Sequence, residues 1–221
     1  MKLSKKITLL LFLTVSMSIF AQKEIKEGII SMKITMSSEN EQVNTSLAML
    51  GDMSTTTYFK GQKSRTEMKS PMTGENTTII DNTTKEMLVL LDNPMLGKKY
   101  MKNTIDTSDE DLNNIEVKET GDTKTILGYK CQGYDIIIKK DDQETKMTMY
   151  TTDKISAPNQ NSAGLGGKVK GYPMYMVLNI SQSGMPLKTT MEVVEIKNEN
   201  IDNSKFDMTI PEGFSEMETG K

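Results

Sequence analysis

The residue types that most often carry out chemistry are scarce in this sequence. Its 221 residues include a single cysteine, Cys131, and no histidine. General acid–base catalysis most often uses histidine, and a cysteine nucleophile needs a neighbouring base, a role for which histidine is missing. Zinc sites need sets of cysteine and histidine, and no pair of carboxylates stands in an apolar setting that would raise a pKa. We therefore expect a protein that is not an enzyme and has neither a zinc site nor a cofactor.

The single cysteine also precludes an internal disulfide, so the fold must be held by its core alone. Cys131 could be a free reactive thiol, or it could pair with a second chain. We favour a third interpretation, in which it is a small buried hydrophobe on a strand.

Methionine is the unusual residue type. There are 19 methionines and no tryptophan. Because methionine is flexible and polarisable, a concave surface lined with it suits a variable apolar ligand such as an acyl chain. Core filling is the simpler alternative. The residues expected to line such a ligand site are Met32, Met36, Met147, Met149, Met174, Met176, Tyr129 and Tyr134.

The pairs Met147-x-Met149 and Met174-x-Met176 allow a further hypothesis. Two thioethers on one strand face could bind copper(I), with Cys131 joining them if its strand is adjacent. Strand alternation alone produces the same spacing, so core packing is favoured over a metal site.

Two other clusters favour structural interpretations. The acidic residues between 106 and 111 could bind calcium, but they lack the D-x-D-x-D-G order of a calcium loop, and helix capping is favoured. Gly164, Gly166 and Gly167 lack the lysine–threonine end and the strand-to-helix setting of a phosphate loop.

The first 21 residues have the pattern of a cleaved secretory signal. Lys2, Lys5 and Lys6 precede an apolar run over residues 7–15, and small residues lead to Ala21. An uncleaved anchor is the alternative, but the run is too short to span a bilayer. No lipobox cysteine lies nearby. We expect a periplasmic or secreted protein with no transmembrane anchor after cleavage, and a single β-rich domain over residues 22–221.

The net charge argues against nucleic acid as a partner. Removal of the signal takes away three lysines and no acid, which moves the formal net charge from −3 to −6. An acidic chain without basic runs is a poor match for a phosphate backbone.

Alternating apolar and polar residues predict a mainly β (α+β) fold. We expect nine or ten strands joined by short turns, which requires a largely antiparallel sheet that curls into an incomplete barrel. Two short helices are expected on its concave side, over residues 46–53 and 108–117. Residues 156–171, rich in glycine and asparagine, are expected to be the least ordered stretch of the mature chain.

The long strand over residues 129–139 is central to this arrangement. Residues 120–122 are expected to form a turn before it. A bulge at Gly133 would bring five side chains onto one core face. These side chains are Tyr129, Cys131, Tyr134, Ile136 and Ile138.

Five segments, taken in order, resemble a family of exported Bacteroidetes proteins catalogued as domain of unknown function 4412. They are YFKGQKSRTEM, IIDNTTKEMLVLL, TGDTKTILGYKCQGY, GYPMYMVL and FDMTIPEGF, and the resemblance runs from about Gly28 to Phe214. The family is more distantly similar to periplasmic lipoprotein carriers, whose half-barrel agrees with the expected sheet.

This resemblance implies a binding or carrier module for a lipid, a lipoprotein or another apolar ligand. The alternative is an envelope structural or interaction protein without a small ligand, in which an exposed edge strand accepts a protein partner.

Overall fold

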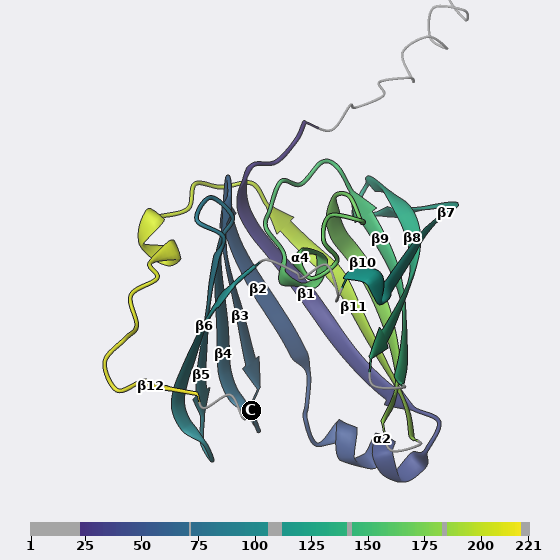
Figure 1. The fold of residues 1–221 in the computed structure, drawn as a ribbon, viewed down its shortest axis with the longest axis horizontal. Helices are drawn as coiled ribbons and strands as arrows, with labels where there is room; N and C mark the ends of the chain where they lie inside the picture. The colour runs from purple at the N-terminus through teal and green to yellow at the C-terminus, as the bar shows by residue number, and fades with distance from the viewer. Residues whose placement is uncertain (1–22, 71, 106–111, 141–142, 183–184, 218–221) are drawn as a thin grey trace, which may run out of the picture.

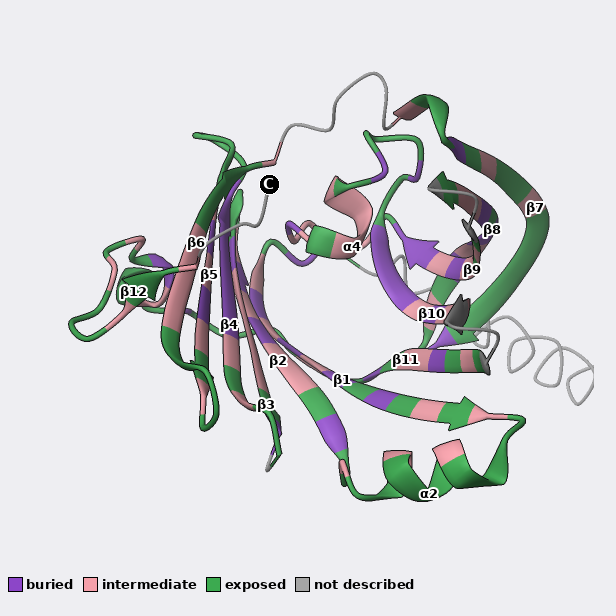
Figure 2. Cartoon of the chain, turned by 60° about the horizontal axis from the view of Figure 1, so that its bottom comes forward, coloured by how far each residue is buried: buried purple, intermediate pink, exposed green. Residues whose placement is uncertain are grey.

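The structure is a computed structural model, which describes residues 23–70, 72–105, 112–140, 143–182 and 185–217. Its strands form one curled sheet. Twelve strands lie in the order β12-β6-β5-β4-β3-β2-β1-β11-β10-β9-β8-β7. The sheet curls into a half-barrel whose two edges, at β12 and β6 on one side and at β7 on the other, do not meet (Figures 1 and 2). The expected antiparallel incomplete barrel is confirmed, with more strands than the nine or ten predicted.

Two antiparallel meanders build this sheet. The first contains β1 (Glu27–Ser38), β2 (Met53–Lys60), β3 (Lys63–Ser70), β4 (Gly74–Asp81), β5 (Glu86–Asn93) and β6 (Gly97–Thr104). The second contains β7 (Ile115–Ile126), β8 (Tyr129–Lys140), β9 (Gln143–Thr152), β10 (Tyr172–Gln182) and β11 (Met185–Lys197). Antiparallel pairing of β1 with β11 joins the two meanders, and β12 (Ser215–Glu216) adds a short parallel strand beside β6.

The helices lie at other positions than the sequence predicts. α2 (Glu41–Ala48) begins before residue 46, because the side chain of Asn40 accepts hydrogen bonds from the N–H groups of Gln42 and Val43. Met53 already belongs to β2. α2 lies at one end of the half-barrel, and α4 (Gln160–Ala163) lies inside the concavity (Figure 2).

The expected helix over residues 108–117 is too long. Its capping residues and the acidic cluster at 106–111 lie outside the described residues. Leu112 and Asn113 are helical, but the extended strand β7 begins at Ile115. None of the helices in the described ranges is long and apolar enough to cross a bilayer.

Residues 120–122 continue strand β7 and do not form the expected turn. The register between β7 and β8 shifts between Glu119 and Thr123, so the extra residues lie in β7, opposite Gly133. A Cβ atom on Gly133 would lie 2.7 Å from the Oγ1 atom of Thr120, which explains the glycine. The register of β8 with β9 is unbroken through Gly133, so the bulge lies in β7 and not at Gly133 as expected. Tyr129, Cys131, Tyr134, Ile136 and Ile138 nevertheless all contribute to one core.

Residues 153–171, named here the inner segment, enter the concavity between β9 and β10 (Figure 2). Ile155, Leu165 and Val169 are buried in the core. The Nζ of Lys168 donates to the carbonyls of Leu112 (2.7 Å) and Ile115 (2.8 Å). The expectation of a poorly ordered stretch is therefore wrong, because this segment supplies the apolar filling for one half of the barrel.

A second, smaller core lies on the opposite face of the sheet. Its buried residues are Ile79, Leu88 and Leu90, whereas their neighbours Thr78 and Ile80 point into the concavity. Residues 198–217, which include η1 (Asn203–Phe206), cross the outer face of β4 to β6 (Figure 1). Their Met208, Ile210 and Phe214 side chains cover this outer core.

Candidate functional site

The predicted methionines form rows across the concave face, because paired residues in adjacent strands share a face. One row crosses six neighbouring strands, from β8 to β2. It consists of Tyr134, Met149, Met176, Met191, Ile34 and Met53, each paired with the next. A second row contains Ile136, Met147, Leu178, Thr189 and Met36.

Seven of the eight predicted ligand-site residues meet in a single core. Met32, Met149, Met174, Met176 and Tyr134 are buried there, and Met147 and Tyr129 pack against it partly exposed. Met36 lies apart, beside α2. Most of the set therefore fills the core beneath the inner segment, and Met32 alone among the eight also lines the cavity described next.

A cavity of about 240 Å³, named here the lumen cavity, lies on the inner face of β1 to β4. Alternation along β2 and β3 places Thr55, Thr57, Thr66 and Met68 toward it. Its lining residues are Met32, Ile34, Thr55, Thr57, Thr66, Met68, Asn76, Thr78, Asn159, Gln160, Asn161, Tyr172 and Met191, and none of them is charged. Apart from Met32, the sequence interpretation missed these residues, because the run of three threonines on β2 does not show which of them face inward.

Polar side chains close the inner end of the lumen cavity. The hydroxyl of Tyr172 forms hydrogen bonds with the side chains of Thr57 and Asn159. The Oγ1 atoms of Thr57 and Thr66 lie 2.9 Å apart. Burial raises the pKa of Tyr172 to about 12, so its hydroxyl stays protonated and can donate. This network ties the cap of α4 to strands β2 and β3 across the concavity.

A groove of about 500 Å³, named here the α2 groove, adjoins the lumen cavity. Ile34 lines both spaces. Met36 and Met53 on the strands face Leu47 and Leu50 across this groove. Apolar side chains therefore continue from the lumen cavity to the end of the half-barrel, although Lys33, Asn44 and Asp52 also line the groove.

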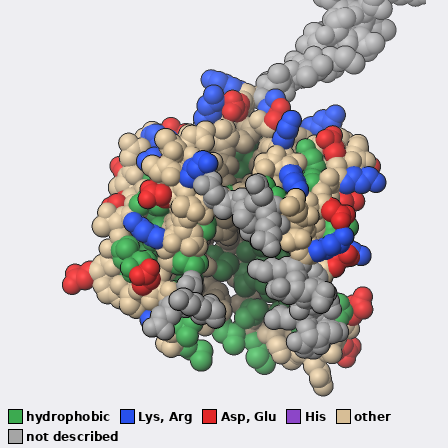
Figure 3. All heavy atoms as spheres, viewed as in Figure 1, with side chains coloured by type: hydrophobic (Ala, Val, Ile, Leu, Met, Phe, Trp, Pro, Cys, Tyr) green, Lys and Arg blue, Asp and Glu red, His purple; other side chains and the backbone are tan. Residues whose placement is uncertain are grey.

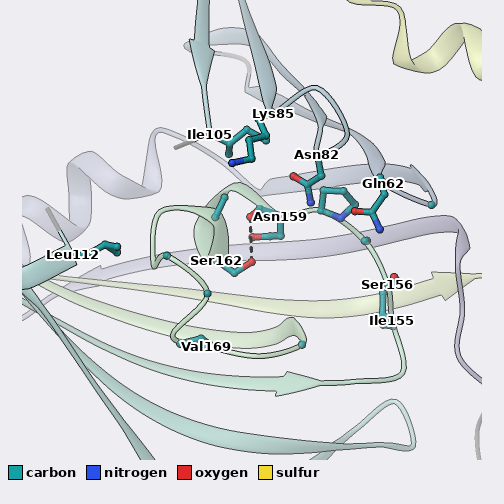
Figure 4. Close-up of a pocket in the computed structure, with 17 residues that line it drawn as sticks. Gln62, Asn82, Lys85, Ile105, Leu112, Ile155, Ser156, Asn159, Ser162 and Val169 are labelled. Carbon is teal, nitrogen blue, oxygen red and sulfur yellow. Dashed lines mark hydrogen bonds between the residues drawn. The ribbon is translucent and has the colours of Figure 1, made fainter. Parts of the chain in front are cut away.

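A larger cavity of about 750 Å³ lies at the opposite end of the half-barrel and has a different character. Gln62, Asn82 and Lys85 line it from the strand turns, facing Asn159 and Ser162 on the inner segment (Figure 4). The Ser162 hydroxyl donates to the carbonyl of Asn159 at 3.2 Å. None of the eight predicted residues lines this space.

Cys131 is fully buried, as expected of a small core hydrophobe. Its thiol donates to the carbonyl of Tyr129 at 3.4 Å, and burial raises its pKa to about 11. Since the thiolate is both the nucleophile and the metal ligand, this environment suppresses both roles. Within the described ranges, no group of three or more cysteine, aspartate and glutamate side chains is placed to hold a metal ion. The copper(I) hypothesis remains a prediction.

No curated protein matches the chain. Among solved structures, PNGF-II matches at 14% sequence identity and a TM-score of 0.49, over 86% of this chain and 31% of that chain. The Mycobacterium tuberculosis lipoprotein LppX matches at 8% identity and a TM-score of 0.33, over 80% of this chain and 89% of that chain. This chain thus spans less than a third of PNGF-II. Both TM-scores lie below 0.5, so neither likeness bears on function.

The family comparison covers most of the chain. The family model for the Domain of unknown function (DUF4412) matches residues 26–214. This range contains all five segments on which the expected membership was based. The bacterial group of origin stays a prediction. The chain belongs to the DUF4412 family.

Proposed function

We propose that the protein is an exported, non-catalytic binding module that holds an apolar chain, such as a lipid acyl chain, in the lumen cavity. The observation that carries this proposal is the empty space between the inner face of β2 to β4 and the residues of α4, directly beside a methionine-rich core. A volume of about 240 Å³ lies just below the range typical of pockets for drug-sized ligands. This volume suits a single acyl chain better than a whole lipid molecule.

The lining supports an uncharged ligand. No lysine, arginine, aspartate or glutamate borders the lumen cavity, so an anionic head group would find no partner there. The hydroxyls of Thr57 and Tyr172 are already engaged with each other. Met32, Met68 and Met191 offer flexible thioethers that can adapt to chains of different shape.

Export is part of the proposal and rests on the signal pattern of residues 1–21. A periplasmic or secreted module of this kind would meet lipids, or the acyl chains of lipoproteins, in the envelope.

The rival function, capture of a protein partner at an open sheet edge, has weaker support. β7 is an edge strand of twelve residues. It carries exposed Glu116, Lys118, Glu119 and Lys124, and its register breaks after Glu119. Charges and bulges are the features by which proteins protect edges from pairing, so β7 is poorly suited to accept a strand.

Titration with a fluorescent fatty acid tests the proposal. Thr55 points into the lumen cavity and Thr56 points to the opposite face, and both are half-buried. Thr55→Phe should fill the cavity and weaken binding by about tenfold or more, whereas Thr56→Phe should bind as the wild type does. Absence of saturable binding by the wild type, or equal binding by both variants, would overturn the proposal.

A further inference from the structure

Exposed apolar side chains concentrate at one end of the half-barrel. Four of the six large apolar residues that are exposed in the described chain lie there: Met49 (71% exposed), Met72 (57%), Met95 (90%) and Leu96 (65%). Met49 follows α2, Met72 lies in the β3–β4 turn, and Met95 and Leu96 lie in the β5–β6 turn. These are separate protrusions from one rim, named here the α2 end.

The two turns are held in fixed positions by Asn93. Its side-chain carbonyl accepts hydrogen bonds from the N–H groups of Met95 (2.8 Å) and Leu96 (3.0 Å), and its amide nitrogen donates to the carbonyl of Thr73 (2.9 Å). The apolar side chains are therefore presented outward by an ordered turn that is tied to its neighbour.

The α2 end is also where the apolar interior reaches the surface. The lumen cavity adjoins the α2 groove at Ile34, and the groove continues past Met36 and Leu50 toward exposed Met49. Figure 3 shows the hollow between the two sides of the molecule, with hydrophobic side chains inside it and at its lower rim.

We propose that the α2 end docks on a lipid bilayer, with Met49, Met72, Met95 and Leu96 inserted at the boundary between head groups and acyl chains. A folded protein partner needs a continuous surface of about 800 Å² on each side, which separate turn tips do not offer. A bilayer accepts such protrusions one by one. Transfer of an acyl chain from the bilayer into the lumen cavity rests on the proposed function. Docking of the α2 end does not depend on it.

The charges near this end select the kind of bilayer. Exposed acidic residues and exposed lysines are mixed in the described part of this rim, so it presents no basic patch to an anionic surface. The acidic residues include Glu39, Glu41, Asp52, Glu75 and Asp92, and the lysines include Lys33, Lys69, Lys98 and Lys188. Binding should therefore depend on apolar insertion and should not be strengthened by anionic lipid.

Flotation of the mature protein, residues 22–221, with phosphatidylcholine vesicles tests docking, because the apolar run of residues 7–15 would itself bind vesicles. The wild type should float, and the triple variant Met49→Asp/Met95→Asp/Leu96→Asp should bind at least about tenfold more weakly. Leu127→Asp/Val194→Asp is the matched control, because Leu127 (49% exposed) and Val194 (50%) lie away from the α2 end. Adding phosphatidylglycerol should not increase binding.

Three results would overturn docking: a wild type that stays with the soluble fraction, a triple variant that floats as well as the wild type, or a control that loses as much binding. The fatty-acid titration separates this proposal from the proposed function. The triple variant should still bind the fluorescent fatty acid, and Thr55→Phe should still float. Loss of one activity without the other therefore identifies which proposal has failed.

Discussion

The two halves of the half-barrel use the same strand alternation in opposite ways. Around β8 to β11, apolar side chains such as Ile136 and Met149 point inward and are buried against the inner segment. Around β4 and β5, the buried apolar side chains Ile79 and Leu88 point outward and are covered by residues 198–217. One half is thus filled from within, and the other is covered from outside.

This difference explains where the lumen cavity lies. A two-faced sheet needs one face buried for stability, and the open half meets that need on its outer face. Its inner residues, such as Thr66 and Thr78, are then free to border an empty space. Under the proposed function, β4 would face the ligand with Asn76 and Thr78 and would pack the outer core with Ile79 on its opposite face.

Thiol labelling should show the largest contrast between the halves. Fully buried Cys131, whose pKa is raised to about 11, should react with a thiol reagent only when the filled half opens. In a Thr55→Cys variant, the new thiol at the half-buried cavity wall should react faster by roughly a thousandfold or more. Peptide mass spectrometry measures both sites in one sample. Equal rates would contradict the contrast between a filled and an open half.

Phe59→Ala should cost the most stability among single substitutions on the first meander. Phe59 lies on strand β2, and its fully buried side chain packs in the core of the filled half. Truncation should lower the free energy of unfolding by about 3–5 kcal/mol, measured by urea denaturation. A cost below about 1 kcal/mol would mean that β2 is not anchored to this core.

Tyr172→Phe tests the link across the concavity. The change removes the hydroxyl that bridges Thr57 and Asn159 but keeps the ring in place. We expect a loss of about 1–2 kcal/mol, together with faster amide exchange in the inner segment. Unchanged exchange in that segment would show that the hydroxyl does not hold it.

The smallest effect concerns pH. Burial raises the pKa of Asp81, but hydrogen bonds from Lys63 and Thr83 outweigh burial, and the net pKa lies below its ordinary value of 3.8. The carboxylate therefore stabilises the fold fully above pH 3.8, and this contribution is lost as the pH falls through the lowered pKa. The stability difference between wild type and Asp81→Asn should shrink by less than about 1 kcal/mol during acid titration. A stability difference that grows on acidification would contradict the lowered pKa assigned to Asp81.

Local patterns predicted the strands well. Period-two alternation placed Met147, Met149 and Met176 on the concave face, and the unusual glycine at 133 marked the irregular pairing of β7 and β8. The start of α2 was missed because the capping role of Asn40 was not recognised.

Long-range packing could not be predicted in the same way. The inner segment buries Ile155, Leu165 and Val169, whose spacing follows no helix or strand period. The lumen cavity depends on residues 198–217 crossing the outer face, which is invisible in the sequence of β2 to β4. The predicted ligand site was therefore placed on the filled half.

Native mass spectrometry of the protein purified from the cells that make it tests the central claim most directly. The wild type and Thr56→Phe should retain a mass that organic extraction removes and identifies as lipid, whereas Thr55→Phe should lose it. A bare polypeptide mass for all three proteins, or an equal lipid mass on Thr55→Phe, would contradict a lumen cavity that binds an apolar chain.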